Sequence, residues 1–182
     1  MTRIDLITAK DQLPAERQGD YEAIFEILGR VGGPFGVLLH SPGLAPMVCR
    51  SGAHVRLQSE LTLAERELAL LSTAREKDGS YEWAHHTPIA REAGVSEAAI
   101  TAIRDYGDTA ALATGEREII DYTRQLLQTN RVTQELFDEL RQRHGTRWLV
   151  ELTATIGQYQ YIAAINNAFE IEPKPGGEVL PL

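Results

Sequence analysis

Two adjacent histidines and a glutamate lie in one short segment whose apolar residues have helical spacing. Glu82 and His86 are four residues apart, so on a helix they lie one turn apart and share the inward face. An imidazole next to a carboxylate suits general acid/base catalysis, because imidazole gains and loses a proton near neutral pH. A lone inward histidine is more often an ordinary core residue, and it is the neighbouring acid that favours a functional site here.

A second acid, Glu67, lies on the apolar face of the helix that precedes this segment. Thr62 and Glu65 have the spacing of a capping box, in which the two side chains bind free amides at a helix start. This helix is predicted to run from Thr62 to about Lys77, and Glu67 then shares a stripe with Leu71. The carboxylate of Glu67 can either pair with an arginine at the surface or point toward the histidines of the next helix.

Apolar residues recur at helical spacing along almost the whole chain. The pattern predicts helices over 14–30, 35–40, 44–58, 62–77, 80–94, 96–106, 114–130, 133–144 and 146–169. Ser80 and Thr114 are expected as N-caps, and Met47 and His54 are expected to face the core. The sequence has no alternating strand pattern, internal repeat or glycine-rich phosphate loop. These features predict an all-α, single-domain helical bundle.

Composition excludes several classes of protein. The chain has 182 residues, 43% of them hydrophobic, which suffices for the core of one domain. A net charge of −8, with 18 lysines and arginines spread along the chain, argues against nucleic acid as a partner. No apolar run approaches the roughly 20 residues that span a bilayer, so no membrane partner is expected. The first residues lack an apolar stretch of signal-peptide length, which predicts a cytoplasmic protein.

Cysteine usage excludes thiol chemistry that needs two sulfurs. Cys49 is the single cysteine of the sequence, so one chain can form neither a disulfide nor a Cys-x-x-Cys redox centre. A zinc site made of several thiolates is excluded for the same reason. Cys49 itself, within Leu-Ala-Pro-Met-Val-Cys-Arg, is predicted to be a small core residue.

Glu67, the run from Glu82 to His86 and the following Ile89–Ser96 together resemble the carboxymuconolactone decarboxylase family, whose fold is that of alkylhydroperoxidase D. The resemblance is most specific over residues 60–125 and weaker at Leu39–Pro42 and Asn167–Glu170. We expect an N-terminal arm and helices packing on the core over 1–58, a family core over 59–171 and a tail over 172–182, and the N-terminal extension departs from the short decarboxylases of the family. The resemblance also implies a homo-oligomer, either a trimer or a hexamer, and no cofactor.

The peroxidase branch of this family has a glutamate, eleven residues, Cys-x-x-Cys, three residues and a histidine. In this sequence the glutamate and histidine match Glu67 and His86, while the cysteine positions fall on Gly79 and Glu82. Neither residue can supply sulfur, so a thiol peroxidase is not expected. The sequence instead resembles the decarboxylase branch. That resemblance implies a cofactor-independent lyase acting on a small carboxylated lactone, or a related carboxylic acid, from the catabolism of aromatic compounds.

Decarboxylation leaves an enolate that must be protonated, which assigns a role to each residue of the segment. His86 is predicted to be the proton donor, Glu67 or Glu82 to orient it, and His85 to act as a second donor or to bind substrate. Substrate-binding candidates are Trp83, Tyr81, Arg50 and His54, and Arg56, Arg75 and Arg91 are further cations that the sequence does not rank.

Two alternatives to the lyase remain open. Glu82-x-x-His85 has the spacing of carboxylate-bridged metal centres in helical bundles, although the sequence has no second Glu-x-x-His. The other alternative is a binding or assembly protein that has the fold without the chemistry. An inward acid and imidazole argue against it, because unpaired buried charge is costly.

Overall fold

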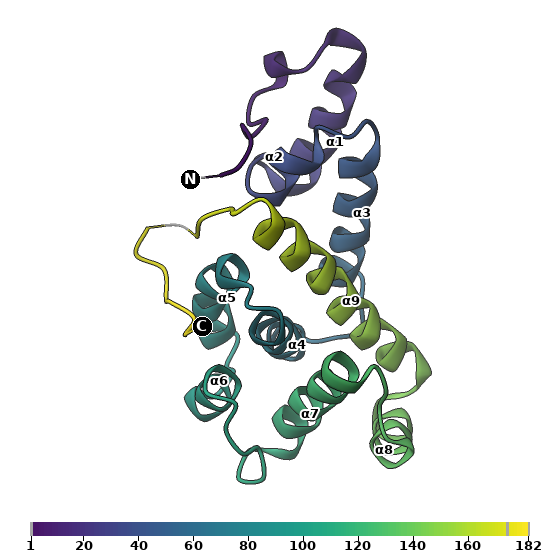
Figure 1. Ribbon diagram of the computed structural model, residues 1–182. Helices are drawn as coiled ribbons and strands as arrows, with labels where there is room; N and C mark the ends of the chain where they lie inside the picture. The colour runs from purple at the N-terminus through teal and green to yellow at the C-terminus, as the bar shows by residue number, and fades with distance from the viewer. Residues whose placement is uncertain (1, 174, 182) are drawn as a thin grey trace. The chain divides into compact units, whose positions relative to one another are not determined.

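The structure, a computed structural model, describes residues 2–173 and 175–181, and every regular element in these ranges is helical (Figure 1). Two 3-10 helices, η1 (Lys10–Gln12) and η2 (Ala15–Arg17), come first. The α-helices are α1 (Gln18–Leu28), α2 (Pro34–Leu38), α3 (Leu44–Leu57), α4 (Leu63–Glu76), α5 (Ser80–Glu92), α6 (Glu97–Arg104), α7 (Thr114–Thr129), α8 (Gln134–His144) and α9 (Thr146–Ala168). The all-α prediction is confirmed, and none of the described helices is both long and apolar enough to cross a membrane.

The chain forms two compact units, and the first comprises the chain up to Gln58 together with Ile165–Glu172. Ile7, near the N-terminus, is 8% exposed, and its backbone N–H donates to the carbonyl of Gly36 over 3.1 Å. Ile7 therefore packs in the core of this unit. The buried apolar residues of this core are Ile7, Leu13, Ile24, Leu38, Leu39, Ala45 and Cys49.

Two residues of α3 that were expected in the core are exposed. Met47 has 57% of its surface exposed, and His54 is exposed with Nδ1 lying 3.0 Å from Gln58 Oε1. Ala45, Cys49 and Val55 lie buried on this helix. The prediction for Met47 and His54 is wrong because helical spacing alone allows more than one choice of inward stripe.

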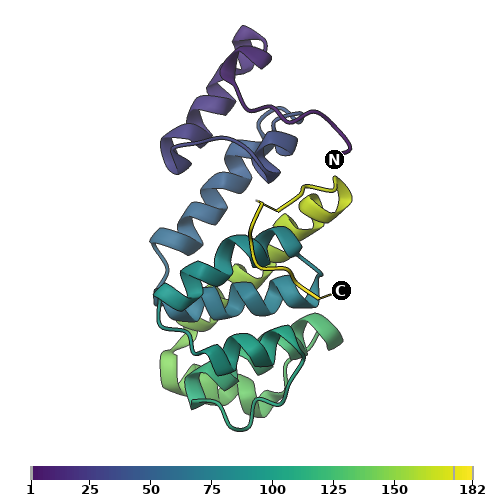
Figure 2. The ribbon, with the colours of Figure 1, turned by 90° about the vertical axis from the view of Figure 1, so that its left-hand side faces the viewer.

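The second unit comprises the rest of the chain, and α4 lies at its centre. In Figure 1 α4 is seen nearly end-on between α5 and α7, and it packs against both. Figure 2 shows these helices from the side. Leu68, Leu70 and Leu71 of α4 meet Trp83 of α5 in one core, and each is at most 3% exposed. Any side chain on this face of α4, including Glu67, is thereby held inside the unit.

The start of α4 is set by the capping box that the sequence predicts. Thr62 Oγ1 accepts a hydrogen bond from the Glu65 backbone N–H over 3.3 Å, and Glu65 Oε2 accepts one from the Thr62 N–H over 2.7 Å. Two of the amides that a helix start leaves unpaired are satisfied in this way. The cap fixes where α4 begins.

The starts of α5 and α7 differ from the prediction by one residue. Ser80 and Thr114 are the first residues of their helices rather than N-caps, and neither helix has a side-chain cap. In α5 the first helical bond runs from the Trp83 N–H to the carbonyl of Gly79 over 2.9 Å, which makes Gly79 the N-cap. The predictions for Ser80 and Thr114 as caps are therefore wrong.

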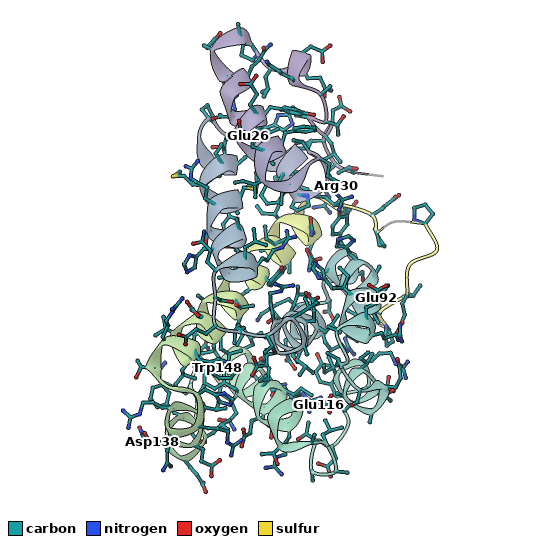
Figure 3. The ribbon with its side chains drawn as sticks, turned by 180° about the vertical axis from the view of Figure 1, so that it is seen from behind. Glu26, Arg30, Glu92, Glu116, Asp138 and Trp148 are labelled. Carbon is teal, nitrogen blue, oxygen red and sulfur yellow. The ribbon has the colours of Figure 1, made fainter. Side chains whose placement is uncertain are left out.

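The turn after α5 is fixed by a carboxylate from α7. Gly94 has φ of +91°, a left-handed conformation that glycine adopts without strain, and Ser96 caps α6 by accepting from the Ala99 N–H over 3.0 Å. Glu116, labelled in Figure 3, accepts from the Ser96 N–H over 2.8 Å and from its hydroxyl over 2.9 Å. These bonds hold the end of α5, the helix that carries both adjacent histidines.

The C-terminal segment returns to the second unit and binds beside α5. Arg91 of α5 donates from Nη1 to Glu178 Oε2 over 2.8 Å and from Nε to Glu97 Oε1 over 2.5 Å. Hydrogen bonds to Glu97 and then Glu178 raise the pKa of the Arg91 guanidinium. Leu180 is 2% exposed and belongs to the core of the unit, whereas its neighbour Val179 is 82% exposed. The segment is thus anchored by one buried leucine and one ion pair.

Leu180→Ala should destabilise the protein by about 2–5 kcal/mol, because it removes a buried side chain and leaves a cavity. The measurement is urea unfolding followed by circular dichroism. Val179→Ala is the matched control, since its side chain is largely exposed and should leave the unfolding midpoint unchanged. Equal midpoints for the two variants would show that the segment does not pack into the core in solution.

Candidate functional site

Glu67 is buried on α4 and is held there by a neighbouring cation. Its side chain is 1% exposed, and the guanidinium of Arg66 donates to Oε1 from Nε over 3.3 Å and from Nη2 over 3.2 Å. The Arg66 side chain is itself only 14% exposed. A buried carboxylate is costly unless it is paired and hydrogen-bonded, and Arg66 supplies both forms of compensation. Arg66 therefore compensates the burial of the Glu67 carboxylate.

His86 of α5 binds the other oxygen of the same carboxylate. Its Nδ1 lies 2.8 Å from Glu67 Oε2, and its side chain is 14% exposed. An ionised carboxylate only accepts hydrogen bonds, so the hydrogen of this bond is on Nδ1. The second ring nitrogen, Nε2, has no hydrogen-bond partner among the described residues. It can take a proton when the ring is neutral and give one when the ring is an imidazolium.

Two aromatic rings hold the plane of the His86 ring. The ring of His85 lies 4.9 Å from that of His86 at an interplanar angle of 88°, and the ring of Tyr159 lies 5.6 Å away at 76°. Both arrangements are edge-to-face, which is a favoured geometry for aromatic pairs. Tyr159 comes from α9 and is 7% exposed. Together with the bond to Glu67, these rings leave His86 little freedom to rotate.

Glu82 and Trp83 lie on the same turn of α5 but have different surroundings. Glu82 is 2% exposed, and a Cβ at Gly79 would lie 3.0 Å from its Oε2 and 3.3 Å from Ala74 Cα. Trp83 is fully buried in the core of the second unit. The two positions that carry cysteine in the peroxidase branch thus hold a carboxylate and a glycine with little room for any side chain.

The remaining predicted residues lie on α3, α4 and α5. Arg50 and His54 are exposed residues of α3, in the first unit, and Tyr81 is half-buried on α5. Their contact with substrate stays a prediction, as does that of Trp83. Arg75 donates from Nε to the Arg104 carbonyl over 2.7 Å. That bond and the two ion pairs of Arg91 give both of these arginines structural roles.

Two residues of the site were missed by the sequence analysis, Arg66 and Tyr159. Arg66 directly precedes Glu67, and the suggestion that Glu67 pairs with an arginine was the signal that pointed to it. Tyr159 reaches His86 through the packing of α9, and no local pattern predicts that contact.

The metal-centre alternative gains no support from the geometry. Glu82 and His85 have the required spacing, but a bundle metal centre needs further ligands. In the part of the chain that the structure describes, no group of three or more His, Cys, Asp or Glu side chains lies close enough to hold an ion.

Cys49 should not react with thiol reagents in the native protein. Burial raises the pKa of its thiol, while Arg56 and Arg50 oppose this shift more weakly, and its side chain is 1% exposed. A raised pKa keeps the thiol protonated, and the thiolate is the reactive form. The measurement is the rate of reaction with an aromatic disulfide at pH 8, with and without urea. Rapid reaction of the native protein would contradict both the burial and the direction of the pKa shift.

The fold and the site together define a class of protein: an alkylhydroperoxidase D-like helical bundle in which Glu67 and His86 are hydrogen-bonded and the single cysteine excludes a thiol pair. The sequence profile of the Carboxymuconolactone decarboxylase family matches residues 42–125, which supports the resemblance to that family. No curated protein sequence gives a significant match.

Solved structures with this fold are similar over nearly the whole chain. An uncharacterized peroxidase-related protein from Silicibacter sp. TM1040 has a TM-score of 0.74 and 18% identity, over 96% of this chain and 92% of that one. An alkylhydroperoxidase AhpD core protein from Ralstonia eutropha JMP134 has a TM-score of 0.75 and 18% identity, over 96% and 93%. The debrominase Bmp8 in complex with 2,3,4-tribromopyrrole has a TM-score of 0.71 and 14% identity, over 96% and 95%. These similarities establish the fold.

Proposed function

We propose that the protein is a cofactor-independent lyase of the carboxymuconolactone decarboxylase type. Its substrate is a small carboxylated lactone, or a related carboxylic acid from the catabolism of aromatic compounds. The observation that carries the proposal is the hydrogen bond from His86 Nδ1 to the buried Glu67, which leaves Nε2 for the reaction. The match of residues 42–125 to the family profile supports the class of reaction.

The reaction has two steps. Loss of CO2 breaks a carbon–carbon bond and leaves its electron pair in an enolate, which is stabilised by the adjacent carbonyl. The imidazolium of His86 then gives its Nε2 proton to the enolate carbon and becomes neutral, and water restores the proton for the next turnover. Glu67 keeps the ring oriented in both states, because it accepts the Nδ1–H of the neutral ring as well as that of the imidazolium.

The charges at the site fit an anionic substrate and an uncharged product. Arg66 and Glu67 have opposite charges and together are neutral. When a substrate carboxylate binds, an imidazolium at His86 balances it. After CO2 has left and the enolate has been protonated, both the product centre and His86 are neutral. A low-dielectric site favours states without net charge. His86 therefore takes up a proton when the substrate carboxylate binds, and that proton leaves with the product.

The relatives named for peroxidase or debrominase activity suggest other chemistry on the same fold, but fold alone does not transfer function. Thiol-dependent peroxide reduction needs two sulfurs, which this site lacks. A lyase that works through Glu67 and His86 needs none.

The test is CO2 release from a panel of carboxylated lactones and β-keto acids by purified protein, before and after treatment with a chelator. Saturable release that survives the chelator is expected. Release that disappears with the chelator and returns with a metal ion would favour the metal-centre alternative. Silence across the panel would favour a different reaction or a binding role.

A further inference from the structure

At the end of the proposed reaction, neutral His86 is a base that lies next to the carbon it has just protonated. Once His86 has protonated the enolate carbon, its neutral Nε2 faces the C–H bond that has just formed. Microscopic reversibility requires that the same nitrogen can remove that proton again. The loss of CO2 is not needed for this step, so a product that never carried a carboxylate can enter at this stage. The inference therefore rests on the proposed function.

The resting state of the site suits an uncharged ligand of this kind. With no substrate carboxylate present, the pair formed by Arg66 and Glu67 is neutral, and a neutral imidazole leaves the group of Arg66, Glu67 and His86 without net charge. Glu67 accepts from Nδ1–H in this state, which fixes the tautomer with its lone pair on Nε2. A neutral histidine held in one tautomer by a carboxylate is a general base.

One nitrogen must both remove the proton and return it. Nδ1 is bound to Glu67 over 2.8 Å, and the rings of His85 and Tyr159 at 88° and 76° hold the imidazole plane. A delocalised anion formed at Nε2 is therefore reprotonated from the same side by the same group. In a conjugated anion the proton can return to either end of the system, and return to the far end moves a double bond.

We propose that the site has a second activity, the 1,3-proton shift of small uncharged enol lactones, with His86 as the single base. Nε2 takes the proton from the carbon between the lactone carbonyl and the double bond, which leaves a dienolate. In the dienolate the C–H electron pair forms a double bond to the carbonyl carbon, the carbonyl π pair moves onto oxygen, and the ring double bond stays in place. When the proton returns to the γ carbon, the π pair of that ring double bond forms the new C–H bond, the carbonyl re-forms, and the new double bond lies between the α and β carbons, which gives the conjugated lactone. No oxidant, reductant or leaving group is involved.

Proton NMR in 2H2O with 5-methyl-2(3H)-furanone as the probe tests the proposal. Wild-type protein should convert it to 5-methyl-2(5H)-furanone, with an enzymatic rate at least about 10²-fold above that of His86→Ala, which is the low end for a positioned base. Some product should keep the original proton at the γ carbon, since one nitrogen carries it between the two ends. His40→Ala is the matched control, because His40 is an exposed histidine of the first unit and should leave the rate unchanged.

Conversion at the same rate by wild-type protein and His86→Ala would overturn the proposal.

A second measurement does not depend on how well the furanone fits the site. The CO2-release assay is run in 2H2O, and the deuterium atoms in each product molecule are counted. More than one deuterium per product molecule supports the proton shift, because the product must have been deprotonated again. Exactly one deuterium, together with an inert furanone, would overturn the second activity while leaving the lyase intact. Conversion of the furanone without CO2 release from any acid would leave the proton shift standing and overturn the lyase.

Discussion

His86→Ala should lower kcat for CO2 release by about 10²–10⁴-fold, the usual contribution of a positioned general acid or base. Nε2 of His86 supplies the proton to the enolate, and Arg66, which also binds Glu67, cannot replace it because a guanidinium does not give up its proton in proteins. Glu67 keeps its bonds to Arg66 in the variant, so the fold should persist. The measurement is kcat at saturating substrate, after circular dichroism has shown that the helical content is unchanged.

Two further variants make this result specific. His40→Ala removes an exposed histidine whose Nε2 lies 2.9 Å from the Asp5 carbonyl oxygen, and it should keep the wild-type kcat. Glu67→Gln should give a kcat between those of wild type and His86→Ala. The glutamine oxygen can still accept from Nδ1–H, but it has no charge to balance an imidazolium. A wild-type kcat for His86→Ala would remove His86 from the mechanism and direct attention to His85.

Trp83→Ala should destabilise the protein by about 3–5 kcal/mol, the range for removing a large aromatic side chain from a core. Trp83 is 0% exposed and packs with α4 leucines at the centre of the second unit. A cavity beside α4 would also loosen the helix that carries Glu67, so kcat should fall in the variant even where it remains folded. Urea unfolding followed by circular dichroism measures the first effect, and CO2 release measures the second.

Trp83→Phe is the matched comparison and should cost far less. The Nε1–H of Trp83 is buried with no hydrogen-bond partner in the described part of the chain, so the phenyl ring leaves no acceptor unsatisfied. Phenylalanine also fills most of the volume. Equal losses for the two variants would mean that the indole contributes through something other than packing. A loss below about 1 kcal/mol for Trp83→Ala would contradict its burial, because core truncations cost more.

The parts of the fold that the sequence predicted are those set by local chemistry. Thr62 with Glu65, and Ser96, start their helices where expected, because a capping side chain binds amides within three residues of itself. Ser80 and Thr114 have the same residue types but form no such bond. Residue type shows that a cap is possible, and the approach angle of the preceding chain decides whether it forms.

The candidate site was predictable only in part, because its contacts depend on how the helices pack against one another. Helical spacing placed Glu67 on an inward face, where it is indeed buried, and left open whether Glu67 or Glu82 would meet His86. That choice depends on how α4 and α5 pack, which one helix pattern cannot determine. Tyr159 lies far along the chain, and its contact with His86 exists only once α9 has packed.

Gly79 makes the thiol-free state of this site hard to reverse by single substitutions. A cysteine introduced at Gly79 alone would bring its Cβ to 3.0 Å from Glu82 Oε2 and 3.3 Å from Ala74 Cα, both too close for an ordinary contact. Glu82→Cys made first would remove the carboxylate, but the contact with the backbone of α4 would remain. A protein engineer who wants two thiols here must therefore change Glu82 before Gly79 and let α4 shift by a few tenths of an ångström. The order of the two steps is imposed by the geometry, and the reverse order passes through a crowded intermediate.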